Sequence, residues 1–247
     1  MPSETLNLTT RDGVCPAHIF RPTTPAPWPA VLVFMDAIGI RPAMLAVGER
    51  LAAEGFYALI PDLYYRGGAY APMNAKTVLV DPEEKKTLFE HFVPLASPAN
   101  VLRDAESMLD FLATQPDVRA GGIATVGYCM GGSLSLTVAG TFPDRVAAAA
   151  SFHGSRLASD APTSPHLLAP QMQARVYVAG AIEDASFPDA MKDRLEQALT
   201  DAGVTHTVET YQAKHGFAIQ DTLAYDVAAE ARHWASLLAV LRTTFAG

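Results

Sequence analysis

Short apolar runs alternate along the chain with longer segments in which apolar residues recur at helical spacing. A continuous apolar run of four to eight residues is typical of a strand buried on both faces of a sheet. The runs that predict strands are 30–35, 56–60, 123–127, 147–152, 175–180 and 206–211. The last run alternates more than the others, which favours a position nearer a sheet edge.

Helices are predicted between these runs. One begins at Ser97, a favourable N-cap followed by Pro98, and ends before Pro116. Two more are predicted over 188–202 and about 222–244. The residues expected on the inner side of the last helix are Tyr225, Ala228, Leu238 and Leu241. Strands that alternate with helices imply right-handed crossovers and a mostly parallel sheet covered on both faces, so the predicted fold class is α/β.

The segment 64–97 is longer than an ordinary connection between a strand and a helix. Within it, residues 82–92 can form a helix that begins at Asp81 and Pro82. The remainder predicts an irregular excursion of the kind that covers active sites, with a plain surface insertion as the alternative. We expect a single domain over residues 1–247.

Composition and charge exclude or disfavour several classes of protein. The chain has 26 acidic and 18 basic residues, a formal net charge of −8, which disfavours binding to nucleic acids and anionic membranes. Hydrophobic residues make up 49% of the chain, which excludes a disordered protein. Its 2 cysteines are too few for a disulfide framework. The opening residues lack a secretory signal and no stretch approaches the roughly 18 apolar residues of a membrane span, so we expect a cytoplasmic protein.

Residues 127–132 read GYCMGG and lie between a predicted strand and a predicted helix. A turn with a nucleophile at its apex and small residues two positions away on each side is the nucleophile elbow of α/β hydrolases. The glycines allow the strand and the helix to pack closely around a strained apex residue. The helix N-terminus favours a thiolate on Cys129, and the Met130 N–H is expected to donate to an oxyanion. A buried structural cysteine is the alternative for Cys129 and the expectation for Cys15.

A cysteine nucleophile needs a histidine base and a carboxylate that orients it. In α/β hydrolases the acid and then the histidine follow the nucleophile along the chain, each on a loop after a strand. Asp184 follows the run 175–180, and His215 follows the run 206–211. Glu183 competes for the role of the acid, and Asp184 is preferred for its spacing to the next predicted helix.

Five segments resemble the dienelactone hydrolase family and extend over nearly the whole chain. They are VLVFMDAIGIRP at 31–42, PDLYYR at 61–66, GYCMGG at 127–132, GAIEDASFP at 180–188 and KHGFA at 214–218. The resemblance implies the α/β-hydrolase fold, hydrolysis of an ester or lactone, and a triad of Cys129, Asp184 and His215. It also implies that the Ala37 N–H is the second oxyanion donor.

The resemblance further implies a carboxylate that modulates the thiol. The family typically carries a glutamate that interacts with the cysteine, and Asp36 stands at the matching position, one methylene shorter. A carboxylate beside a thiol opposes its ionisation through like-charge repulsion, so Asp36 could keep Cys129 neutral until substrate binds.

Two departures from the family concern the substrate. Its dienelactone-cleaving members hold a substrate carboxylate with two arginines, but this chain has Ile219 at one position and no arginine in 83–90, where the other would fall. Arg66, Arg41 or Lys86 could compensate, or could be solvated surface charges. The residues expected to line the substrate pocket are Ile38, Tyr64, Arg66, His153, Phe217 and Ile219. For His153, a structural role is the alternative.

The leading hypothesis is a cofactor-free hydrolase of small esters or lactones that forms an acyl-thioester. The alternatives are an acyltransferase that uses the same residues and a non-catalytic protein that binds small ligands. No metal site is expected because the histidines and acids do not cluster at ligand spacing, and glycine-rich phosphate or dinucleotide loops are missing. The expected partner is a small-molecule substrate, and the sequence does not indicate an oligomeric state.

Overall fold

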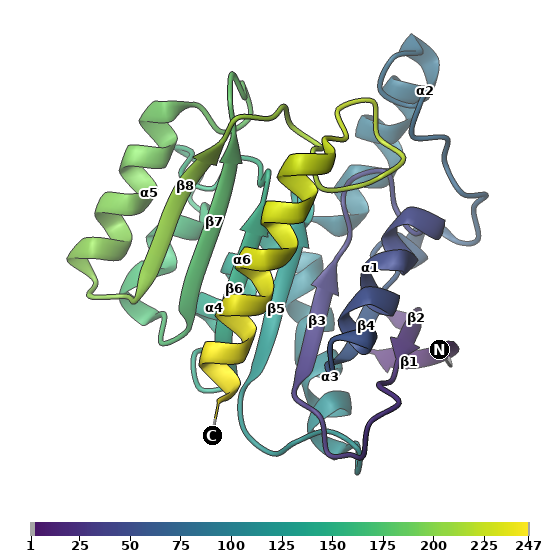
Figure 1. Cartoon of the computed structure of the whole chain (residues 1–247). Helices are drawn as coiled ribbons and strands as arrows, with labels where there is room; N and C mark the ends of the chain where they lie inside the picture. Colours follow the sequence, from purple (N-terminus) through teal and green to yellow (C-terminus); the bar gives the residue numbers. More distant parts are fainter. Residues whose placement is uncertain (1–2, 247) are drawn as a thin grey trace. The chain divides into compact units, whose positions relative to one another are not determined.

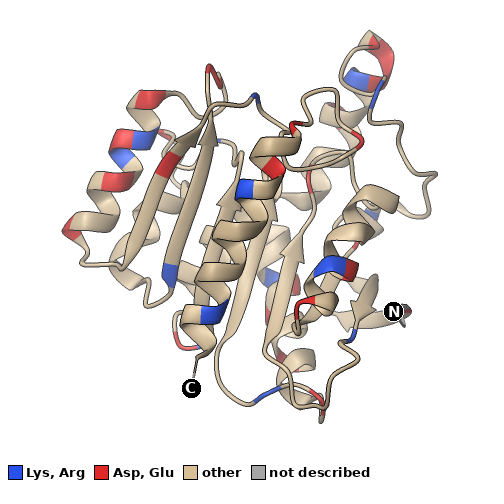
Figure 2. Cartoon of the chain, viewed as in Figure 1, with Lys and Arg blue, Asp and Glu red and all other residues tan. Residues whose placement is uncertain are grey.

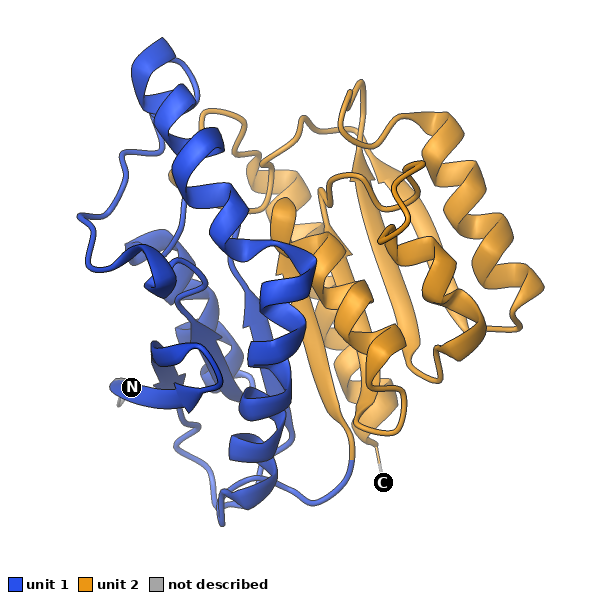
Figure 3. Ribbon diagram, turned by 180° about the vertical axis from the view of Figure 1, so that it is seen from behind, with its two compact units in different colours: residues 1–121 blue, residues 122–247 orange. Residues whose placement is uncertain are grey.

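The structure is a computed structural model that describes residues 3–246. The chain forms two compact units, divided between Gly121 and Gly122 (Figure 3). The expectation of one domain over 1–247 stays a prediction, and its residues 1, 2 and 247 lie outside the described residues.

Unit 1 has strands in the order β1-β2-β4-β3. Their bounds are β1 (Ser3–Thr10), β2 (Gly13–Phe20), β3 (Ala30–Phe34) and β4 (Tyr57–Pro61). β2 pairs antiparallel with β1 and β4, whereas β3 and β4 are parallel. The helix α1 (Pro42–Ala53) packs against β2 and β4, and α3 (Pro98–Thr114) packs against β1 from the other side (Figure 1).

The connection from β4 to α3 is a chain of short helical turns that extends away from the strands of unit 1 (Figure 1). Its elements are η1 (Tyr65–Gly67), α2 (Pro82–Thr87), the π-helical turn η2 (Leu88–Phe92) and η3 (Val93–Ala96). The predicted start of α2 is confirmed, because the Asp81 side chain accepts hydrogen bonds from the N–H groups of Glu83 and Glu84. The predicted helix over 82–92 is α-helical only to Thr87 and then widens into η2.

Unit 2 has strands in the order β5-β6-β7-β8, all parallel. Their bounds are β5 (Ile123–Tyr128), β6 (Val146–Phe152), β7 (Arg175–Ala181) and β8 (His206–Tyr211). The helix α4 (Met130–Thr141) packs against β5 and β6, α5 (Asp189–Asp201) against β8, and α6 (Val227–Phe245) against β6 and β7. α6 covers one face of these strands, and α4 and α5 cover the other (Figures 1 and 3). The short helix η4 (Pro165–Gln171) packs against α4 and α5.

The strand predictions are confirmed to within one or two residues, and so is the edge position of β8 at the end of the order. The buried strands β5 and β6 carry no charged side chain, whereas the helices and loops carry many (Figure 2). Parallel strands that alternate along the chain with helices packed against them confirm the α/β class. None of the helices formed by residues 3–246 is both long and apolar enough to cross a bilayer.

The predicted start of the last helix at about 222 is wrong. Thr222 Oγ1 bonds the carbonyls of Gly216 and Ile219, which keeps this part of the chain in a hydrogen-bonded loop. The helix begins after Asp226, whose side chain accepts a hydrogen bond from the Ala229 N–H at 2.8 Å. The residues assigned wrongly to its inner side are Tyr225, which precedes the helix, and Ala228, which is exposed.

Candidate active site

Cys129 lies at the junction of β5 and α4 in a strained backbone conformation. Its φ is 53° and its ψ is −117°, a region that residues other than glycine rarely adopt. A Cβ on Gly127 would lie 1.8 Å from the Gly131 carbonyl oxygen. One on Gly132 would lie 2.3 Å from Ser151 Oγ of β6. Gly127 is therefore required by the close approach of β5 and α4, and Gly132 by the packing of α4 against β6. The strand–turn–helix predicted for residues 127–132 is therefore present.

Asp184 and His215 lie on the loops that follow β7 and β8. His215 Nδ1 is 2.7 Å from Asp184 Oδ2, and His215 also hydrogen-bonds Cys129. The Ile182 N–H donates to the Ala213 carbonyl at 3.0 Å, which joins the two loops. The residues that the sequence singled out from three separate loops are thus in contact within unit 2.

Electrostatics favour a charged histidine in this arrangement. Burial acts to lower the pKa of His215, but its hydrogen bonds with Asp184 and Cys129 outweigh burial and raise this pKa to about 10. Burial acts to raise the pKa of Asp184, but hydrogen bonds from His215 and Ser186 lower it to about 2. Asp184 is therefore ionised at neutral pH, and His215 is held as an imidazolium.

The competing acid, Glu183, is exposed and has a φ of 52°, and Asp184 is the carboxylate that contacts His215. The positive φ of Glu183 turns the chain so that Asp184 points inward.

Two serines in contact with these residues were not predicted from the sequence. Ser186 donates to Asp184 Oδ1 through both its N–H and its hydroxyl, at 2.9 and 2.7 Å. Ser155 Oγ is 3.8 Å from Cys129 Sγ. An Asp followed two residues later by Ser is a local signal for the first contact, whereas nothing in the sequence marks Ser155.

Of the pocket candidates in unit 2, His153 packs against His215. His153 is 1% exposed, has a φ of 39°, and packs against the rings of His215 and Phe217 at centroid distances of 5.1 and 5.0 Å. Both ring nitrogens of His153 are buried without a hydrogen-bond partner, and burial together with His215 keeps its pKa well below the usual value. Phe217 and Ile219 are buried.

The candidates of unit 1 include a buried ion pair. Both oxygens of Asp36 bind the Arg41 guanidinium, at 2.7 and 2.9 Å, and Oδ1 also accepts the Ile38 N–H. Ile38 itself is buried. The Tyr64 hydroxyl donates to the Ala37 carbonyl at 2.7 Å, which fixes the peptide group between Ala37 and Ile38.

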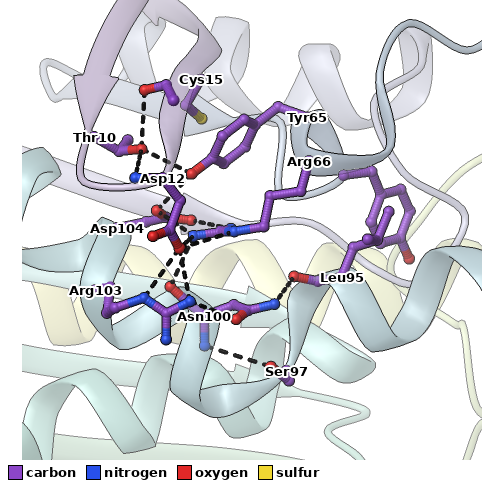
Figure 4. Close-up of polar contacts among 12 residues, drawn as sticks. Thr10, Asp12, Cys15, Tyr65, Arg66, Leu95, Ser97, Asn100, Arg103 and Asp104 are labelled. Carbon is purple, nitrogen blue, oxygen red and sulfur yellow. Dashed lines mark hydrogen bonds and ion pairs between the residues drawn. The ribbon is translucent and has the colours of Figure 1, made fainter.

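Arg66 belongs to a polar cluster of unit 1 (Figure 4). Its guanidinium binds both oxygens of the fully buried Asp104, at 2.7 and 2.8 Å, and also binds Asp12. The Tyr65 hydroxyl donates to Asp104 at 2.8 Å. The sequence left open whether Arg66 and Arg41 are solvated surface charges. Both are paired with buried carboxylates instead.

Cys15 has a structural environment. It is fully buried in β2, and burial raises the pKa of its thiol to about 12. Among residues 3–246, His, Cys, Asp and Glu side chains form no group of three that could hold a metal ion.

Comparisons with known proteins identify the family of the chain. The model of the dienelactone hydrolase family matches residues 15–245. A Synechocystis sp. protein named "Putative carboxymethylenebutenolidase" is 28% identical over 235 residues, which cover 92% of this chain and 90% of that protein. The "Carboxymethylenebutenolidase" of Pseudomonas sp. strain P51 is 33% identical over 111 residues, 45% of this chain and 44% of that protein. A crystal structure of a "Putative Dienelactone Hydrolase" from Klebsiella pneumoniae has a TM-score of 0.83 and 25% identity, with 97% of each chain covered.

Proposed function

This chain belongs to the dienelactone hydrolase family, and from that premise we propose that it hydrolyses small esters or lactones through an acyl-thioester on Cys129. The names of its relatives indicate the class of reaction, ester or lactone hydrolysis. The observation that carries the mechanism is the contact of His215 with both Asp184 and Cys129, at the apex of the turn between β5 and α4.

In the acylation step, the Cys129 sulfur attacks the acyl carbon and forms a C–S bond. The carbonyl oxygen becomes an oxyanion, and we assign its stabilisation to the backbone N–H groups of Met130 and Ala37. When the C–O bond to the leaving group breaks, the His215 imidazolium gives its Nε2 proton to the departing oxygen. Asp184 holds the Nδ1–H throughout, which leaves Nε2 to exchange protons.

In the deacylation step, neutral His215 takes a proton from water, and the hydroxide attacks the thioester carbonyl. The C–S bond then breaks, the acid product leaves, and the sulfur returns to the thiolate beside the imidazolium. Every proton and electron pair in the cycle comes from substrate, water or these side chains, so the proposal requires no cofactor.

We expect substrates whose acyl part is uncharged. The family's arginine positions hold Ile219 and a segment without arginine, and the guanidinium groups of Arg41 and Arg66 are bound to Asp36 and Asp104. A neutral ester should therefore be hydrolysed faster than its analogue with an acyl carboxylate.

By its resemblance to the family's glutamate, Asp36 would oppose ionisation of Cys129 in the free enzyme. Alkylation of Cys129 by iodoacetamide in Asp36→Asn should then reach its half-maximal rate at a lower pH than in the wild type. If the pH of half-maximal alkylation is unchanged, Asp36 does not affect the ionisation of Cys129, and its role is the ion pair with Arg41.

The proposal is tested with a panel of nitrophenyl esters and simple lactones. Cys129→Ala should lose nearly all turnover, and His215→Ala should lose about 10²-fold or more. Cys15→Ala is the matched control, because it removes a thiol that has no role in the mechanism. Full turnover in Cys129→Ala would rule out the thioester.

A further inference from the structure

The loop that follows β3, residues 36–41, contains a backbone N–H group without an acceptor. The Ile38 N–H donates to Asp36 Oδ1 at 3.0 Å, and the Gly39 N–H donates to the Asp36 carbonyl at 3.1 Å. The Ala37 N–H, in contrast, has no hydrogen-bond acceptor in the described part of the chain, although Ala37 is only 7% exposed. A buried N–H without a protein partner is rare, so this donor can bind an acceptor on a ligand.

Two tyrosines of the connection from β4 to α3 hold this loop by hydrogen bonds. The Tyr64 hydroxyl donates to the Ala37 carbonyl at 2.7 Å. The Tyr70 hydroxyl accepts the Ile40 N–H at 3.4 Å and donates its own hydrogen to Asp62 Oδ1 at 3.0 Å. The same carboxylate oxygen accepts the Tyr64 N–H at 2.9 Å. The Asp62 carboxylate therefore anchors both tyrosines that contact the loop.

These hydrogen bonds hold both peptide groups that meet at the Ala37 Cα. The peptide group before it carries the Ala37 N–H, and its carbonyl accepts the Gly39 N–H. The peptide group after it is held at both ends, because its carbonyl accepts from Tyr64 and its N–H donates to Asp36. Since each peptide group is planar, fixing both planes fixes the direction of the Ala37 N–H. The Tyr64 hydroxyl is the member of this set that comes from outside the loop.

Gly39 shows how closely the two tyrosines pack against the loop. Its φ is 85°, and a Cβ added to it would lie 3.0 Å from the Tyr70 hydroxyl oxygen and 3.3 Å from the Tyr64 ring. The Tyr64 side chain is fully buried, and both tyrosine rings pack against Phe92, at centroid distances of 5.4 and 5.2 Å. Packing therefore holds the Tyr64 hydroxyl in place, and the hydroxyl in turn holds the loop.

We propose that Tyr64 is a positioning residue for ester hydrolysis, because its hydroxyl keeps the Ala37 N–H in the direction that stabilises the oxyanion. This inference rests on the proposed function, in which that N–H stabilises the oxyanion formed when Cys129 attacks the acyl carbon. Tyr64 acts through Ala37, since its hydroxyl hydrogen goes to the Ala37 carbonyl. A donor that is fixed before the reaction stabilises the developing charge without the cost of turning toward it.

The test compares two reactions of Cys129 in the full-length chain, of which only one forms an oxyanion. Acylation by a nitrophenyl ester forms an oxyanion and is measured as kcat/KM. Alkylation by iodoacetamide displaces iodide from a saturated carbon and forms none, and peptide mapping separates Cys129 from Cys15. Tyr64→Phe removes the hydroxyl and keeps the ring. We expect kcat/KM to fall about tenfold, less than the roughly 10²-fold or more for complete loss of an oxyanion donor, and the alkylation rate to stay unchanged.

Tyr65→Phe is the matched control, because it makes the same chemical change one residue further along the chain. The Tyr65 hydroxyl donates to Asp104 at 2.8 Å and contacts Thr10, both outside the loop 36–41. Its removal should leave kcat/KM for the ester and the rate of alkylation at their wild-type values. Circular dichroism of both variants shows that they are folded.

An unchanged kcat/KM in Tyr64→Phe overturns the proposal. Equal falls in acylation and alkylation also overturn it, because they would indicate a general disturbance of the site, and so does a fall in Tyr65→Phe as large as that in Tyr64→Phe. The proposed function is judged separately. Tyr64→Phe can be without effect while Cys129→Ala still abolishes hydrolysis, whereas full hydrolysis by Cys129→Ala removes the proposed function and this inference with it.

Discussion

At the residue scale, the ion pair of Asp36 and Arg41 should be costly to separate because both side chains are buried. Their side chains are 5% and 2% exposed, and two hydrogen bonds join them. A buried ion pair adds little stability by itself, but removing one partner leaves an uncompensated buried charge. We expect Asp36→Asn to lower the free energy of unfolding by about 3 kcal/mol, measured by urea denaturation.

Glu54→Gln is the matched control for Asp36→Asn. Glu54 pairs with Arg50 on the surface of α1, and the Arg50 side chain is 53% exposed. The same change from carboxylate to amide should cost about 0.5 kcal/mol or less there. Equal losses at the two sites would mean that the buried pair is no more important than the exposed one.

The sequence could place Cys129, Asp184 and His215 because their positions depend on the backbone. Each follows a strand, and parallel strands bring such loops to one edge. The partners of Arg41 and Arg66 could not be predicted in the same way, because they depend on where long side chains turn after folding. Ser155 was missed for the same reason, since its contact with Cys129 joins residues that are 26 positions apart.

At the scale of elements, the turn between β5 and α4 leaves no room for a side chain at Gly127, two residues before its apex. A Cβ on Gly127 would overlap the Gly131 carbonyl, which is backbone and cannot move aside without shifting α4. We expect Gly127→Ala to destabilise the protein by more than about 3 kcal/mol, measured as the loss of folded protein in urea.

Gly203→Ala is the control for this substitution. Gly203 follows α5 with a φ of 69° and open space around it. Alanine there should lower the free energy of unfolding by about 1 kcal/mol, because its only cost is the left-handed backbone conformation. If Gly127→Ala proved as mild as Gly203→Ala, the crowding of the turn would not be what determines its sequence.

The cluster around Asp104 connects three elements of unit 1 (Figure 4). Arg66 of η1 binds Asp104 of α3 and Asp12 of the β1–β2 turn. Arg66→Ala leaves the fully buried Asp104 without its guanidinium, so we expect a loss of about 3 kcal/mol in the free energy of unfolding. Arg103→Ala removes a 41% exposed guanidinium from Asp12 and should cost less than about 1 kcal/mol. A loss from Arg103→Ala as large as that from Arg66→Ala would contradict this account.

The boundaries of elements show where sequence patterns stop being informative. The apolar spacing of the last helix continues back to Tyr225, but the side-chain bonds of Thr222 and the cap at Asp226 set its actual start. The π-helical turn η2 likewise replaces the end of a predicted α-helix, and Leu88 is buried within it. Contacts formed in the folded chain set both helix boundaries, and the spacing of apolar residues along the sequence does not predict such contacts.

At the scale of the whole molecule, the free energy of unfolding depends on pH through every group whose pKa differs between the folded and unfolded chain. The pKa of His215 is raised to about 10, so its contribution to stability is fully present below its unfolded pKa of about 6.5 and is lost as the pH rises toward 10. The pKa of Asp184 is lowered to about 2, so its contribution is present above about pH 4 and is lost as the pH falls toward 2.

The pair formed by Asp184 and His215 should therefore stabilise the chain most between about pH 4 and 6.5. We expect the wild type to exceed Asp184→Asn by about 2 kcal/mol in unfolding free energy in this window, and the difference to shrink steadily between pH 6.5 and 10. Urea denaturation of both proteins at intervals across pH 4–10 measures it. Glu183→Gln, a change at the neighbouring exposed carboxylate, should show no such dependence. A difference that grows with pH would mean that His215 is neutral in the folded protein, and the thiolate–imidazolium pair from which acylation is proposed to start would then not exist.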